Sequence, residues 1–256
     1  NTGISFRQVS KRYGGAQSPL VVNAIDFHVP KGTLTTILGP SGCGKTTTLR
    51  MIAGLESPSS GQIFIDGRDV THLGPAERNV SMVFQSYALF PHMSVLENVM
   101  AGRHPRTHAG IAAAVFRTGG FKAEEKAIAA RAQELLDYVG IGKYADYRAR
   151  TLSYGDQRRL EIARALATDP VLLALDEPAA GFNPQEKVEL GDLIKKIRDA
   201  GYAVLLIEHD MSLVMKISDR VSVLDFGQKI ADGTPSEIQS NQKVIDAYLG
   251  VVDNAS

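Results

Sequence analysis

The feature that most constrains this chain is the glycine-rich run GPSGCGKTT at residues 39–47. Residues 34–38 before it are mostly apolar and typical of a buried strand, and residues 46–55 continue in a helical pattern that ends at Gly54. Strand, glycine turn and helix in this order let backbone N–H groups surround phosphate oxygens. An incidental glycine turn beside a lysine would rarely match the whole GxxxxGK[ST] pattern in this setting. The sequence therefore predicts an α/β fold with a phosphate-binding loop for a nucleotide.

The phosphate loop (residues 39–47) supplies several kinds of ligand. We expect Lys45 to reach the terminal phosphates of ATP and the Thr46 hydroxyl to coordinate Mg²⁺. The predicted nucleotide-binding residues are Gly39, Pro40, Ser41, Gly42, Cys43, Gly44, Lys45, Thr46 and Thr47.

Cys43 is the single cysteine of the chain, which excludes an internal disulfide framework and a cysteine zinc site. Its place beside Lys45 and a helix N-terminus predicts a lowered thiol pKa. The simpler interpretation is a small residue that fits a tight loop, and the sequence predicts no redox role.

Length and composition limit the classes of protein that fit. The chain has 256 residues, of which 44% are apolar, and this suits one large α/β domain or a core with a small insertion. Lys and Arg together number 28, as do Asp and Glu, so charge gives no case for nucleic-acid binding. No apolar run approaches the length of a membrane span, and no secretory signal is visible. These features favour a cytosolic protein.

The first part of the chain predicts a β-rich layer. Residues 4–9 and 21–29 alternate between apolar and polar side chains, and residues 62–65 lead into a hairpin turn at 66–67. Tyr13 follows the first strand, where its ring would either stack on a purine base or simply pack at the strand end.

Three further apolar runs, residues 80–84, 171–175 and 203–207, predict buried strands that deliver polar side chains. Open α/β sheets bind their ligands at the carboxyl ends of the strands. We therefore expect Asp176 to join the Mg²⁺ shell and Gln85 to reach Mg²⁺ or the attacking water. Glu177 is expected to point the other way from Asp176, toward that water. A lone histidine is usually structural, but the position of His209 at such an edge favours a γ-phosphate contact.

Between residues 103 and 150 the composition shifts to charged and alanine-rich segments. Residues 123–139 predict an amphipathic helix within an inserted helical subdomain, and the basic loop at 103–108 predicts a solvated tip. A glycine break is expected at 119–120 and a polar turn at 152–157, followed by a helix. Ser153 and Gly155 would offer a hydroxyl and an N–H to a phosphate, or serve as an ordinary helix start. Later segments predict a helix after residue 183, a hairpin around Gly227 and short helices at 236–239 and 242–248.

The order of these motifs resembles the ATPase subunit of an ABC transporter, and the resemblance covers essentially the whole chain. The motifs are, in order, Tyr13, the phosphate loop, Gln85, LSYGDQ, VLLALDEP, residues 180–183 and His209. The resemblance implies a P-loop NTPase with a RecA-like core sheet, an N-terminal antiparallel β layer and an inserted helical subdomain. It assigns residues 1–90 and 156–256 to the β layer and core, and 91–155 to the helical subdomain, of one ABC-type ATPase domain.

The resemblance also implies roles for single residues. Tyr13 stacks on adenine, Gln85 is the Q-loop glutamine, Glu177 is the general base and His209 is the switch histidine. LSYGDQ is the signature motif, in which Ser153, Gly155 and Asp156 bind ATP, and residues 180–183 form the intersite D-loop. Tyr154, Asp156 and Asn183 depart from the usual residues of these motifs.

The resemblance further implies partners. One copy cannot complete the site, so a head-to-tail dimer, with an identical copy or a paralogue, would hold two ATP molecules. Membrane-spanning permease subunits would dock at residues 85–95, and a solute-binding protein would take part indirectly. The chain would then lie at the cytoplasmic face of the plasma (inner) membrane, peripheral to it and soluble when expressed alone.

The resemblance to importer groups divides along the chain. Up to about residue 100 the motifs resemble sugar, polyamine and sulfate importers, and later motifs resemble branched-chain amino-acid importers; divergence, recombination and an assembled chimera would each give this mixture. The back part favours branched-chain amino acids as cargo, with sugar, polyamine or sulfate as the alternative. A soluble DNA-repair or translation ATPase of the same family is the alternative from another class, but its coiled coil, zinc insertion or second cassette is not seen. A nucleotide kinase would lack the signature helix and the Asp176–Glu177 pair.

Overall fold

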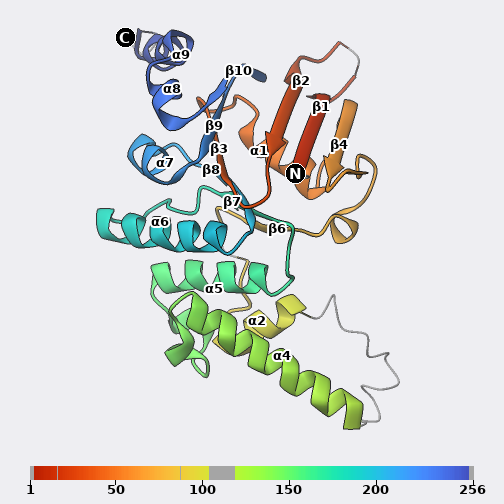
Figure 1. Cartoon of the computed structure of the whole chain (residues 1–256), viewed down its shortest axis with the longest axis vertical. Helices are drawn as coiled ribbons and strands as arrows, with labels where there is room; N and C mark the ends of the chain where they lie inside the picture. The colour runs from red at the N-terminus through yellow and green to blue at the C-terminus, as the bar shows by residue number, and fades with distance from the viewer. Residues whose placement is uncertain (1–2, 16, 87, 104–118, 254–256) are drawn as a thin grey trace. The chain divides into compact units, whose positions relative to one another are not determined.

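The computed structural model describes residues 3–15, 17–86, 88–103 and 119–253, with the backbone alone at 119–122 and 249–253 (Figure 1). The chain divides into two compact units, one of residues 1–82 and 171–256 and the other of residues 83–170. The predicted division into a core and a subdomain at 91–155 stays a prediction. Among the described residues, no helix combines the length and the apolar character that crossing a bilayer requires.

The first unit contains the predicted antiparallel β layer. Its strands lie in the order β2 (Leu20–Val29), β1 (Ile4–Arg12), β4 (Ser60–Ile65) and β5 (Arg68–Asp69). Ile4 of β1 pairs with Val29 on one side and Ile65 on the other, which sets one apolar face of the layer toward the core. The turn between β4 and β5 has positive φ at two successive residues, as hairpin turns of type I′ require.

The second sheet of this unit is mainly parallel. Its order is β10 (Gln228–Gly233), β9 (Arg220–Asp225), β3 (Leu34–Leu38), β8 (Ala203–Ile207), β7 (Leu172–Asp176) and β6 (Val80–Val83). All residues of β3, β7 and β8 are buried, which explains why these strands are mostly or wholly apolar. β9 and β10 pair antiparallel, which confirms the predicted hairpin around Gly227.

Strand register brings three loops to one level of this sheet. Ile207 of β8 lies opposite Ile37 of β3 and also opposite Asp176 of β7. The phosphate loop, Glu177 and residues 208–210 therefore leave neighbouring strands at nearly the same height, as the sequence predicted for a parallel sheet.

The helices of this unit are α1 (Lys45–Ala53), α6 (Pro184–Asp199), α7 (Met211–Ile217), α8 (Pro235–Gln239) and α9 (Gln242–Asp253), with a 3₁₀ turn at Pro75–Glu77. Asn183 caps α6 by accepting a hydrogen bond from the Glu186 N–H, and the Glu186 carboxylate accepts one from the Asn183 N–H. The apolar face predicted for α6 is buried, and its members are Leu190, Leu193, Ile194 and Ile197.

The second unit is built on α2 (Val95–Arg103), α4 (Gly119–Tyr138) and α5 (Tyr154–Leu166), with 3₁₀ turns at Gly142–Tyr144 and Ala149–Thr151. These three helices pack on one another. Two expectations were wrong. Residues 154–157 form the first turn of α5 rather than a polar turn, and Gly119 and Gly120 belong to α4. Except for Arg103, the predicted basic loop lies outside the described residues.

Candidate active site

The phosphate loop joins β3 to α1 at the carboxyl edge of the parallel sheet. A side chain at Gly39 would place its Cβ 2.1 Å from the Leu224 carbonyl oxygen, and one at Gly44 would lie 2.7 Å from the Val21 carbonyl oxygen. Gly44 also has φ +103° and is the N-cap of α1, so no side chain caps the first turn of this helix. The N–H groups of that turn are therefore available to an anion.

Lys45 lies along the loop that precedes it. Its Nζ donates to the carbonyl oxygens of Gly39, at 2.7 Å, and Pro40, at 2.9 Å. The ammonium charge is thus held inside the curve of the loop, where an incoming phosphate would meet it.

The Cys43 thiol contradicts one expectation. Its pKa is raised rather than lowered, because burial outweighs the opposing charge and hydrogen bonds of Lys45. Cys43 is only 3% exposed, and its Sγ lies 3.8 Å from the Lys45 Nζ. The structure thus gives a packed, protonated thiol, in line with the simpler interpretation.

One carboxylate ends strand β7 and a second follows it directly. Asp176 is buried, and burial followed by repulsion from Glu177 raises the pKa of its carboxyl, while Arg50 and Lys45 act in the opposite direction. Glu177 has φ +47°, a left-handed conformation that costs energy for a residue with a side chain. Its N–H donates to the carbonyl oxygen of Ile207 at 2.9 Å, which fixes this turn against β8.

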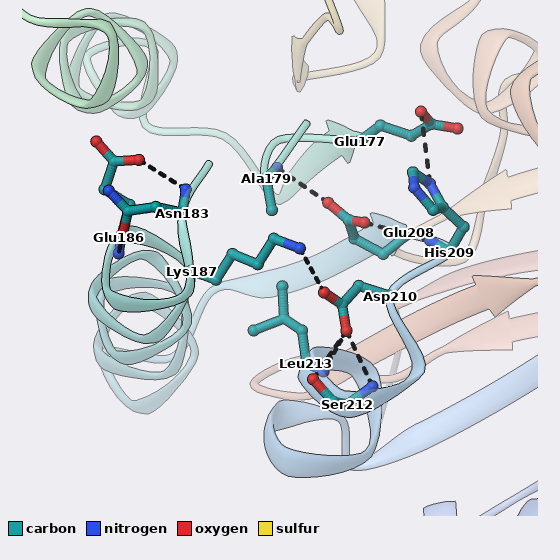
Figure 2. Close-up of polar contacts among 10 residues, drawn as sticks. All are labelled: Glu177, Ala179, Asn183, Glu186, Lys187, Glu208, His209, Asp210, Ser212 and Leu213. Atoms are coloured by element: carbon teal, nitrogen blue, oxygen red, sulfur yellow. Dashed lines mark hydrogen bonds and ion pairs between the residues drawn. The ribbon is translucent and has the colours of Figure 1, made fainter. Parts of the chain in front are cut away.

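Glu177 and His209 face each other across the strand ends (Figure 2). The His209 Nδ1 lies 3.7 Å from the Glu177 Oε2. Both residues line a cleft of about 410 Å³ together with Val21 and the phosphate-loop residues Gly39, Ser41, Gly42, Gly44, Lys45, Thr46 and Thr47. The structure therefore brings together the predicted cradle, the predicted base and the predicted histidine.

Two charged residues near this edge had no predicted role. Glu208 is 1% exposed and accepts hydrogen bonds from the Ala179 and His209 N–H groups (Figure 2). Asp210 caps α7 by accepting from the Ser212 and Leu213 N–H groups, and it receives a 2.7 Å contact from the Lys187 Nζ. Lys187, the Ser212 hydroxyl and the Leu213 N–H hold the pKa of Asp210 well below its usual range. An aspartate or serine before a helical pattern signals a cap such as that of Asp210. The contact of Glu208 is with a residue 29 positions away and leaves no local signal in the sequence.

Two tyrosines lie at other parts of the first unit. Tyr13 is 48% exposed, and the Lys11 Nζ lies over one face of its ring, 4.9 Å from the centroid. That the ring stacks on a purine base stays a prediction. Tyr248 of α9 packs on the apolar cluster that contains Leu38. Burial raises the pKa of Tyr248 to about 12, against a backbone hydrogen bond from Gly39.

The signature residues lie in the second unit. Ser153 is the N-cap of α5: its Oγ accepts from the Asp156 N–H at 3.2 Å and donates to the Asp156 carboxylate at 2.9 Å. The structure thus shows the ordinary helix start that the sequence also allowed. That Ser153, Gly155 and Asp156 bind a nucleotide stays a prediction.

Gln85 also belongs to the second unit, where α5 holds its backbone. The fully buried Arg158 donates to the carbonyl oxygens of Phe84, at 2.6 Å, and Gln85, at 3.0 Å. Arg158 also pairs with Glu161 at 2.7 Å, and Glu161 accepts from the Ala88 N–H at 2.8 Å. The predicted docking segment is therefore tied by its main chain to the helix that begins at the signature motif. The role of the Gln85 side chain at Mg²⁺ or water stays a prediction.

Comparison with known proteins places these features in a family. The sequence profile described as ABC transporter matches residues 22–180. A second profile, described as branched-chain amino acid ATP-binding cassette transporter, matches residues 228–254.

Curated relatives match along nearly the whole chain. The high-affinity branched-chain amino acid transport ATP-binding protein BraF of Pseudomonas aeruginosa is 41% identical over 94% of this chain and 95% of its own length. The LivG protein of Escherichia coli K12, of the same description, is 39% identical over 96% and 97%. The spermidine/putrescine import ATP-binding protein PotA of Thermobifida fusca is 41% identical over 92% of this chain but 58% of its own length.

Solved structures agree in fold. The ADP conformation of an ATP-binding cassette of an ABC transporter superposes with a TM-score of 0.84 at 27% identity, covering 98% of this chain and 99% of that one. A dimeric bacterial ABC transporter cassette gives a TM-score of 0.75 at 26% identity, covering 91% and 98%. The predicted fold class is confirmed.

Proposed function

Because the chain belongs to the ABC transporter ATP-binding family, we propose that it drives the uptake of branched-chain amino acids through separate membrane subunits. It is an ABC-type ATPase that binds ATP. The observation that carries the choice of cargo is the likeness to BraF and LivG over nearly the full length of all three chains. The match of residues 228–254 to the branched-chain family adds to it.

Nucleotide binding rests on the phosphate loop. The uncapped first turn of α1 and the Lys45 ammonium meet the triphosphate, and the exposed Tyr13 ring stacks on the base. The loop is pre-formed, since the strands on which it depends are buried and its glycines pack tightly on Val21 and Leu224.

The residues present fit Mg²⁺. Thr46 lines the cleft. Asp176 is a buried carboxylate beside that of Glu177, and a cation would balance the negative charge of this pair. Within the described residues no cluster of three or more His, Cys, Asp or Glu side chains is arranged to hold a metal ion, so phosphate oxygens would complete the shell. We assign Thr46 and Asp176 to this ion, and the contribution of Gln85 stays a prediction. When bound it neutralises charge on the phosphates.

Hydrolysis follows from the residues that face the cleft. Water attacks the γ-phosphorus, its proton passes to the Glu177 carboxylate, and the bond to the β–γ bridging oxygen breaks to give ADP and inorganic phosphate. His209 donates a hydrogen bond to the γ-phosphate and, on its other side, faces Glu177. Lys45 balances the charge that develops on the phosphate oxygens.

A dimer completes the site in this proposal. Ser153, Gly155 and Asp156 of a second copy or of a paralogue would close over the ATP held in the phosphate loop. A dimeric cassette among the solved structures supports this arrangement. Each copy would thus contribute to both nucleotide sites.

The docking surface for the membrane subunits lies at residues 85–95 of the second unit. Phe90 is 40% exposed, and the Arg164 guanidinium lies 5.0 Å from its ring centroid. The Ala149 N–H donates to the Met93 carbonyl and the Val95 N–H to the Tyr147 carbonyl, so main-chain hydrogen bonds hold this segment against residues 147–149. A solute-binding protein would act through the membrane subunits, and the chain would sit peripherally at the cytoplasmic face of the membrane.

The alternative cargo is a polyamine or another solute of the sugar and sulfate group. The identity to PotA supports it, although this chain spans little more than half of that protein. A soluble ATPase outside transport, as in DNA repair or translation, is the alternative of another class, and balanced charge argues against it.

The test is transport in proteoliposomes made with the membrane subunits that co-purify with the chain and their solute-binding protein. We expect ATP-dependent uptake of radiolabelled leucine, and none with the Glu177→Gln variant in the same complex. Uptake of spermidine, maltose or sulfate without leucine would refute the choice of cargo. Robust ATPase activity with no membrane subunit co-purifying would instead favour the soluble class.

A further inference from the structure

Glu208 is a buried carboxylate that uses both of its oxygens on main-chain N–H groups. Its Oε1 accepts from the Ala179 N–H at 2.9 Å, and its Oε2 accepts from the His209 N–H at 3.2 Å. The side chain is 1% exposed. Figure 2 shows its carboxylate between Ala179 and His209. One carboxylate therefore joins two segments that lie 29 residues apart in the chain.

The two segments flank the predicted chemistry. Ala179 lies two residues after Glu177, in a turn closed by the Ala180 N–H to the Glu177 carbonyl at 3.2 Å and the Phe182 N–H to the Ala179 carbonyl at 3.1 Å. This turn leads into α6. His209 carries the imidazole that faces Glu177 at 3.7 Å. Glu208 thus fixes the backbone on both sides of the Glu177–His209 pair.

Packing alone does not account for a carboxylate at this place. Burial opposes its ionised form and raises the pKa of Glu208, while the N–H groups of Ala179, His209 and Asp210 and the charge of His209 act against the rise. An apolar side chain at this position could be buried without this cost, as the neighbouring Ile207 is. An apolar side chain would, however, leave the Ala179 N–H without this acceptor. The benefit that remains is geometric.

We propose that Glu208 is a positioning residue for ATP hydrolysis, which holds His209 and the turn after Glu177 in the register that turnover requires. The proposal rests on the proposed function, because it assumes that Glu177 and His209 act on ATP. Glu208 itself does not line the cleft, so it acts through its two neighbours and not on the nucleotide.

The sharpest variant is Glu208→Gln, which keeps the size of the side chain and leaves one acceptor oxygen. An amide can accept from Ala179 or from His209, but its NH₂ then faces the other N–H. We expect kcat for ATP to fall about tenfold or more, as for a small misplacement of groups at a reacting centre. The dissociation constant for ATP should stay within about twofold, because the phosphate loop is not touched. The matched control is Glu189→Gln on the exposed face of α6, which should change neither value.

Hydrogen exchange at single amides gives a readout that does not depend on activity. In the parent protein the Ala179 and His209 amides should exchange slowly. In Glu208→Gln at least one of them should exchange about tenfold faster, with the amides of residues 42–47 unchanged.

Three results would overturn the proposal: unchanged kcat in Glu208→Gln, equal losses of ATP affinity and kcat, or free exchange of both amides in the parent. The exchange measurement on the parent needs no variant, so the proposal can be refuted even if the Glu208→Gln protein fails to fold. If the parent has no ATPase activity at all, the proposed function fails instead, and the exchange data still report whether Glu208 holds the two segments.

Discussion

Gly44 offers a measurement of how tightly the phosphate loop is built. It has φ +103°, and a Cβ there would meet the Val21 carbonyl oxygen at 2.7 Å and the Val22 side chain at 3.1 Å. Gly201 has nearly the same backbone, φ +96°, with no atom within 4 Å of its Cβ position. It precedes β8, at the opposite end of that strand from the active site, and lies in the same compact unit. The two glycines therefore separate backbone strain from steric clash.

The expected magnitudes follow from these contacts. Alanine in a left-handed conformation costs about 1–2 kcal/mol, and this is the whole expected loss for Gly201→Ala. Gly44→Ala adds an overlap with backbone that cannot rotate away, and such overpacking costs about 1–3 kcal/mol. We thus expect losses in the free energy of unfolding of about 1–2 kcal/mol for Gly201→Ala and about 2–5 kcal/mol for Gly44→Ala.

Urea unfolding of both variants, with ATP affinity measured in parallel, tests this reasoning. Gly201→Ala should bind ATP as the parent does, while Gly44→Ala should bind it more weakly because the loop must move away from β2. Equal urea midpoints for the two variants would show that the Val21 contact does not constrain the loop. Parent-like ATP affinity in Gly44→Ala would contradict the pre-formed cradle.

Three further outcomes test single groups. Glu177→Gln should lower kcat for ATP by about 10²–10⁴ through loss of the general base while retaining ATP affinity, and full turnover in a steady-state assay would remove Glu177 from that role. Lys45→Ala should raise the ATP dissociation constant about 10- to 100-fold in a calorimetric titration, since one charge-assisted contact is lost; an unchanged constant would contradict its assignment. Tyr248 has a pKa of about 12 in the folded chain, above the unfolded value of about 10, so its contribution to stability is complete below pH 10 and lost toward pH 12. Between pH 9 and pH 11, the free energy of unfolding measured in urea should therefore fall less for Tyr248→Phe than for the parent. Equal losses would contradict the raised pKa of Tyr248.

The parallel core was predictable because its signals are local. Buried strands in a parallel sheet are nearly continuous in apolar residues; β8 is wholly apolar, β7 is apolar up to Asp176, and β3 is apolar apart from two threonines. Once three such strands are assigned to one sheet, their carboxyl ends must meet, and this placed Lys45, Asp176 and His209 together before any distance was known. The cleft that Lys45 and His209 share confirms that argument.

The start of α5 was a miss that the sequence had the means to avoid. Tyr154 to Gln157 contain a glycine and an aspartate, which suggested a turn. However, a serine just before a helical pattern is a common N-cap, and the structure shows the Asp156 N–H donating to the Ser153 Oγ, which in turn donates to the Asp156 carboxylate. Local capping chemistry outweighed the turn propensity of Gly155.

Other features depend on distance in the fold and have no local signature. The pKa of Cys43 was predicted from the charge of Lys45, two residues away, but its direction is set by burial, which sequence spacing does not report. The role proposed for Glu208 depends on Ala179, 29 residues earlier, and only the pairing of β7 with β8 brings the two together.

The same pairing explains why the active site tolerates a strained residue. Glu177 is held at φ +47° by its own N–H to Ile207, while the following turn is held through Ala179 by Glu208. The two anchors are Ile207, the last residue of β8, and Glu208, which follows it. The contacts that stabilise the left-handed conformation therefore form only when β7 and β8 are in register. A slip of one residue between these strands would break both anchors and turn the Asp176 side chain to the other face of the sheet. The placement of Glu177, His209 and Glu208 therefore depends on the register between β7 and β8.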